Sequence, residues 1–180
     1  MNDPAKSLRD KEFERFEIAI GAEADPTMRV LRAHLFSENL IERLLTLRLP
    51  RGDKIIENGN FSYHQKLVLL ESLDFLPDSL VSALRNLNKL RNLCAHELDK
   101  KITEGDITRV GSPLGKKFTL YKRDAKLDDS VLLGKVIAYI CGHLTGACHE
   151  LEYPDHETET PSKETHNLAE TRETRGRNQE

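Results

Sequence analysis

The sequence predicts an all-α protein, built as a bundle of four or five helices. Apolar residues recur at helical spacing in several long windows, and a length of 180 residues suits one domain. We expect an N-terminal amphipathic helix and linker over residues 1–26 and the bundle over residues 27–152. Residues 153–180 carry almost no apolar side chain and cannot offset their ordering entropy by burial, so we expect a disordered tail there.

The N-terminal half is expected to begin with helices over residues 7–23 and 27–49. The first is charged and amphipathic, and the second has a wide apolar stripe at helical spacing. Thr27 follows Pro26 and is an acceptable N-cap for the second helix. The next segment, residues 51–60, is polar and contains two glycines, which is typical of a loop.

The rest of the chain is expected to hold three more helices and a small β-hairpin. Helices are predicted over residues 62–75, 79–100 and 127–152 from their apolar periodicity. The segment over residues 105–123 reads ITRV, then GSPLG, then KKFTLY, which favours two short strands joined by a turn.

Composition excludes several classes of protein. No apolar run approaches the roughly 18 residues of a membrane span, and the N-terminus lacks the basic-then-apolar order of a secretory signal. We therefore expect a cytoplasmic protein with no membrane contact. The net charge of −3 means that any nucleic-acid site must be a local basic patch.

The cysteines are expected to be reduced thiols. Cys94, Cys141 and Cys148 are an odd number and all lie in predicted helices, which argues against a disulfide framework. Cys141 and Cys148 are seven residues apart on one side of a helix, beside its apolar face. A zinc site normally collects ligands from separated segments, so buried core cysteines are favoured over a metal site, and we expect neither a metal nor a cofactor.

The helix over residues 79–100 carries an unusual polar pattern, within LRNLNKLRNLCAHEL. A helical projection places one polar stripe opposite the core face; it contains Arg85, Asn88, Lys89, Asn92, His96 and Asp99. The opposite face is expected to be core and includes Leu98. Arg91 fits neither group and lies beside the apolar border, so it must extend towards water or find an acidic partner. In a purely structural interpretation, the stripe is a solvated helix face and Arg91 forms a salt bridge.

The stretch from Arg91 through Asn92 to His96 resembles the R-x4-6-H signature of the HEPN superfamily, in which a polar residue, often Asn, commonly follows the arginine. The resemblance covers roughly residues 27–100, including the segment SENLIERLL in an early helix. It implies a HEPN-like helical bundle and, for many members, a metal-independent endoribonuclease that dimerises through the motif helices. A toxin or phage-defence role, with an antitoxin or other regulatory protein as a partner, is implied by the resemblance alone.

The residue types suit this implied chemistry. An imidazole titrates near neutrality, so His96 can take a proton from the 2′-hydroxyl of RNA or give one to the leaving oxygen. A guanidinium stays charged and binds phosphate oxygens in pairs, so Arg91 can stabilise the transition state. Asn92, one turn before His96, can orient that ring or bind the phosphate. A two-fold dimer supplies two histidines, one for each proton transfer.

Other residues are candidates to support RNA binding or to hold Arg91. Basic residues for the RNA backbone are Arg85 and Lys89 on the motif helix and Lys116 and Lys117 near the predicted hairpin, although each could equally belong to a solvated surface. Glu38 and Glu42 lie one turn apart, and one of them could pair with Arg91. Because some HEPN proteins bind or regulate without cleaving, the alternative is a non-catalytic regulatory or protein-interaction module.

Overall fold

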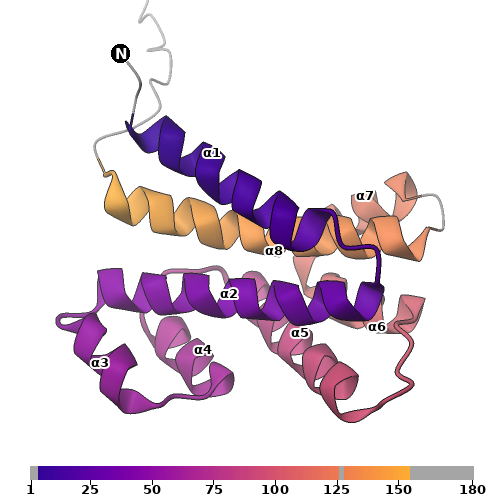
Figure 1. Cartoon of the computed structure of the whole chain (residues 1–180), viewed down its shortest axis with the longest axis horizontal. Coiled ribbons are helices and arrows are strands. Elements are labelled where there is room, and N and C mark those ends of the chain that lie inside the picture. The colour runs from indigo at the N-terminus through magenta and orange to yellow at the C-terminus, as the bar shows by residue number, and fades with distance from the viewer. Residues whose placement is uncertain (1–3, 126–127, 155–180) are drawn as a thin grey trace, which may run out of the picture.

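The computed structural model describes residues 4–125 and 128–154, and in these ranges the chain is helical with no β-strand (Figure 1). The all-α prediction is therefore confirmed. The helices are α1 (Pro4–Phe16), a π-helical turn η1 (Glu17–Gly21), α2 (Pro26–Arg48), α3 (Gly52–Gly59), α4 (Tyr63–Ser72), α5 (Asp78–His96), α6 (Glu104–Gly111), a 3-10 turn η2 (Ser112–Leu114), α7 (Lys116–Asp124) and α8 (Asp129–Glu152).

The two long helices α2 and α8 lie side by side and run in the same direction, with α1 along the other side of α8 (Figure 1). Contacts at both ends fix their register. Arg29 Nη1 donates to the carbonyl oxygen of Ser130 at 2.9 Å, and Arg43 Nε donates to Glu152 Oε1 at 2.7 Å. Helices α4 and α5 pack against the opposite side of α2, so α2 is the central element of the bundle.

Local signals explain where α2 begins and ends. The Asp25 carboxylate accepts from the backbone N–H of Met28 at 2.7 Å, so the N-cap is Asp25 and the expectation of Thr27 is wrong. Pro26 occupies the first turn, where its missing N–H costs nothing. The helix ends at Arg48 because Leu49 precedes Pro50 and is extended.

The core is formed by fully buried aliphatic side chains that several helices contribute to one cluster; they include Leu44, Leu67, Leu84 and Ile137. Burying a side chain of this size stabilises the fold by roughly 1.5–3 kcal/mol relative to exposure. Leu98, which was expected on this face, is fully exposed because α5 ends two residues before it.

Two segment predictions are wrong. Within residues 51–60 the chain forms α3, Gly52–Gly59, flanked by the left-handed residues Arg51 and Asn60, so the glycines do not mark a loop. Residues 105–123 form α6, η2 and α7 in place of a hairpin. Their buried apolar residues recur every three or four positions, at Ile107, Val110, Leu114 and Phe118, which is the period of a helix. A capping box from Thr103 to Asp106 starts α6.

Helix α8 is the one helix in the described ranges that is long and apolar enough to cross a membrane by length and composition. Half of its most apolar window is buried, and its buried residues pack against α2, which is the pattern of a core helix. Most of the predicted tail, residues 155–180, lies outside the described residues; Tyr153 caps α8 and Pro154 follows it.

Candidate functional site

Helix α5 positions the motif by burying one face. Leu84, Leu87 and Leu90 are at most 3% exposed and fix the rotation of the helix against the core. The motif residues then occupy the last two turns, and His96 is the final residue of the helix. The backbone N–H of Glu97 donates to the carbonyl oxygen of Leu93 at 3.0 Å and completes the last turn of α5.

The predicted polar stripe on α5 is only partly open. Lys89, Asn92 and His96 are exposed. Arg85 is half-buried and forms an ion pair with Glu71 at 2.5 Å. Asn88 is also half-buried, because it faces α2 and its amide oxygen lies 3.0 Å from the ring of a buried histidine. Asp99 is exposed and lies beyond the end of α5.

Arg91 is half-buried, and its Nη1 donates to Asn92 Oδ1 at 3.2 Å. Arg91 and Asn92 are thus brought together within one chain. His96 lies five positions after Arg91 on another side of the helix, and within the described ranges no hydrogen bond or ion pair holds its ring. The geometry therefore presents a fixed cation with its amide partner, and separately an open imidazole.

The two candidate acids do not pair with Arg91. Lys66 of α4 binds both, with its Nζ 2.7 Å from Glu38 Oε1 and 2.5 Å from Glu42 Oε1. The two carboxylates favour the charged form of Lys66 and raise its pKa, although its burial acts the other way. No carboxylate of the described residues forms a salt bridge with Arg91, so this guanidinium keeps its capacity to bind an anion.

Beneath the motif lies a polar layer that sequence reasoning missed. His34 of α2 is 3% exposed and stacks on the ring of Tyr63 at a centroid distance of 4.1 Å. The Ser37 hydroxyl lies 3.0 Å from the Tyr63 hydroxyl. Burial lowers the pKa of His34, and the charges of Arg91 and Lys66 lower it further. The one available signal was His34 itself, a polar residue on the apolar stripe of α2.

The remaining candidate cations lie on another helix. Lys116 and Lys117 are exposed on α7, and Lys117 Nζ lies 5.2 Å from the centroid of the Tyr121 ring. Phe118 is buried and packs into the core, which leaves Tyr121 as the aromatic neighbour of these lysines. These lysines and the motif residues therefore lie on different helices, α7 and α5.

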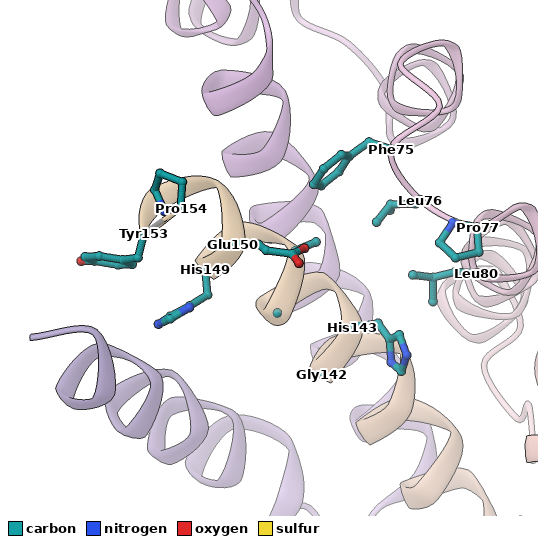
Figure 2. A pocket seen from close by; sticks show the side chains of 12 residues that line it. Phe75, Leu76, Pro77, Leu80, Gly142, His143, His149, Glu150, Tyr153 and Pro154 are labelled. Carbon is teal, nitrogen blue, oxygen red and sulfur yellow. The ribbon is translucent and has the colours of Figure 1, made fainter. Parts of the chain in front are cut away.

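A groove of about 820 Å³ separates α8 from the α4–α5 junction (Figure 2). Phe75, Pro77 and Leu80 face His143 and Glu150 across it. None of the motif residues lines this groove. Two glycines of α8, Gly142 and Gly146, line the groove and add no side chain to it. A Cβ added at either glycine would meet no atom within 4 Å.

The thiols behave as core groups. Cys141 and Cys148 are buried, and burial raises the pKa of each to about 12, so both are protonated and unreactive at neutral pH. Cys94 is half-buried, and burial also raises its pKa. In the part of the chain that the structure describes, no group of three or more His, Cys, Asp or Glu side chains is placed to hold a metal ion.

Comparisons of the chain with protein-family profiles, with curated protein sequences and with solved structures found no match. A function is therefore inferred from the residues themselves. They offer a guanidinium with its amide partner and, one turn after that amide on the same helix, an exposed imidazole.

Proposed function

We propose that the protein is a HEPN-type, metal-independent endoribonuclease whose motif consists of Arg91, Asn92 and His96. The observation that carries the proposal is the arrangement at the end of α5. The Arg91 guanidinium, 3.2 Å from the Asn92 amide oxygen, has no carboxylate partner among the described residues, and His96 is exposed one turn after Asn92.

The proposed reaction uses the RNA's own nucleophile. The 2′-hydroxyl oxygen attacks the adjacent phosphorus, and one His96 takes its proton. The bond from phosphorus to the 5′-oxygen breaks, and a second His96 gives that oxygen a proton. Arg91 and Asn92 bind the phosphate oxygens, where negative charge accumulates in the transition state. The products are a 2′,3′-cyclic phosphate and a 5′-hydroxyl end.

Two copies of the chain are needed for this chemistry. One α5 helix presents Arg91 and His96 on different sides, and one histidine cannot be both the acid and the base of one cleavage event. A two-fold axis along the exposed faces of two α5 helices brings both sets of motif residues into one cleft. Lys89, which is exposed on the same face, would bind the RNA backbone there, and Lys116 and Lys117 would bind it further from the cleft.

The biological setting forms part of the same proposal. A toxin or defence nuclease acts in the cytoplasm, where its RNA substrate lies, and has to be neutralised until it is needed. We therefore propose a cytoplasmic homodimer with an antitoxin or another regulatory protein as a partner.

Cleavage of single-stranded RNA in the presence of EDTA tests the proposal. The wild type should cut and leave 2′,3′-cyclic phosphate ends, and a substrate with 2′-deoxy sugars should stay intact. His96→Ala should lose about 10²–10⁴-fold in rate, the usual contribution of a general acid or base. The matched control is His143→Ala, which removes another exposed imidazole on α8. Cutting that survives His96→Ala, or a wild type that does not cut, contradicts the proposal.

A second candidate function is supported by one observation. No hydrogen bond or ion pair from a described residue orients the His96 ring, as would suit a residue that only contacts a partner. In that case the end of α5 is the surface of a non-catalytic HEPN-type regulatory or protein-interaction module. A wild type that binds a partner protein through Asn92 and His96 but never cuts RNA would favour this function.

A further inference from the structure

His34 is a buried histidine that the proposed reaction does not use. Its Nε2 lies 3.0 Å from Asn88 Oδ1, and its ring stacks on Tyr63. Its other ring nitrogen, Nδ1, is buried and has no hydrogen-bond partner in the described part of the chain. An unpaired buried polar atom costs roughly 1–3 kcal/mol, so packing alone does not account for a histidine at this position.

The surroundings of His34 decide its charge. When Nε2–H donates to the Asn88 oxygen, Nδ1 is a bare lone pair and the ring is neutral. A proton on Nδ1 would create a buried cation with an N–H that has no acceptor. The charged groups that act on the ring are Glu38 of α2, Lys66 of α4 and Arg91 of α5. The two cations oppose a proton on the ring, and Glu38, which favours it, is already bound by Lys66.

His34 is linked to the motif through α5. Asn88 lies three residues before Arg91 and four before Asn92, so these side chains occupy neighbouring positions on successive turns. The bond between His34 and Asn88 therefore holds the turn of α5 from which the motif begins. The positive charge of Arg91 in turn disfavours a proton on the His34 ring. By the same interaction, a protonated His34 would repel the Arg91 guanidinium.

We propose that neutral His34 is a positioning residue for Arg91: it fixes the last turns of α5 through Asn88, and its protonation in acid displaces the Arg91 guanidinium. A proton on His34 adds a second positive charge to the layer on which the charge of Arg91 already acts, and it repels the guanidinium. The part of this inference that concerns RNA cleavage rests on the proposed function, whereas the coupling of His34 to Arg91 does not.

The direct test is the NMR signal of the Arg91 Nε–H group in the full chain, assigned by its loss in Arg91→Lys and followed from about pH 8 to about pH 5. In the wild type the signal should shift, with a midpoint below the ordinary histidine value of 6.5. His34→Gln can still donate to Asn88 but cannot be protonated, so the shift should vanish. Ser37→Ala is the matched control, because it removes a hydroxyl from the same layer without touching α5, and it should retain the shift.

Cleavage kinetics supply the second readout. His34→Phe keeps an aromatic ring on Tyr63 but loses the bond to Asn88, and it should lower kcat about tenfold with KM unchanged, as expected when about 1.4 kcal/mol of alignment is lost. His34→Gln should retain more of its neutral-pH rate in acid than the wild type does.

The outcomes separate the two proposals. An Arg91 signal that does not move in the wild type, or that moves equally in His34→Gln, overturns the role of His34 even if the protein cuts RNA. A signal that behaves as expected in a protein that never cuts RNA upholds the coupling and overturns the proposed function.

Discussion

The buried His34 ring should make the folded state sensitive to acid. An unfolded histidine takes up its proton near pH 6.5, whereas burial lowers the pKa of His34 in the fold. Between these two values the unfolded state binds more protons, so the free energy of unfolding falls as the pH decreases through 6.5. The loss ends once the pH is below the folded pKa.

The size of the effect follows from the linkage slope. While His34 remains neutral in the fold, each pH unit below 6.5 costs about 1.4 kcal/mol. Over one unit below that value, the wild type should lose up to about 1.4 kcal/mol that His34→Gln does not lose, because glutamine binds no proton.

Urea denaturation at about pH 7.5 and about pH 5.5 measures this difference, since the other titrating groups are common to both proteins and cancel. The wild type should lose more of its stability between these conditions than His34→Gln, while Ser37→Ala should show the pH dependence of the wild type. An equal loss in wild type and His34→Gln would mean that His34 titrates alike in the folded and unfolded chains, which contradicts its burial.

Five further variants test the packing and one ion-pair cluster by urea denaturation. Leu84→Ala removes a side chain that is 0% exposed and should cost about 3 kcal/mol, whereas Leu98→Ala, at a fully exposed position, should change stability by less than about 0.5 kcal/mol; equal effects would contradict the core assignment. Gly111→Ala places a methyl group 2.3 Å from the Phe118 ring and should cost about 1–3 kcal/mol. Gly142→Ala meets no atom within 4 Å and should be neutral or stabilising by up to about 1 kcal/mol. A larger loss from Gly142→Ala than from Gly111→Ala would be inconsistent with the structure. Lys66→Met leaves two carboxylates without their cation and should cost about 2 kcal/mol at neutral pH; a variant as stable as the wild type would show that the ion pairs do not stabilise the fold.

Periodicity predicted the long helices well because their buried faces are wide. The apolar stripe of α2 placed that helix within one residue at each end. Periodicity failed in the short helices, where a few apolar residues fit both the helical and the strand pattern. In α6 and α7 the β-branched and aromatic residues suggested strands, but Ile107 and Val110 are spaced for one face of α6, and Phe118 is buried by the next helix, α7.

The candidate site was predicted as a position on α5 and not as a set of contacts. A helical projection identified Arg91 as the residue between the polar and apolar faces, and the structure finds it half-buried there. The projection could not show that Asn88 contacts His34, because that contact depends on how α2 and α5 pack. For the same reason it could not show that Lys66 holds both candidate acids.

The proposed nuclease depends on two α5 helices that meet and share one cleft. A cross-link between exposed positions of α5 tests it most directly, with Asn92→Cys in a Cys94→Ser background and a short bis-maleimide reagent. We expect a covalent dimer from this variant and none from Asn58→Cys on α3, which is also exposed and lies on another helix. A chain that stays monomeric, or that cross-links through position 58 and not through position 92, would contradict the shared cleft.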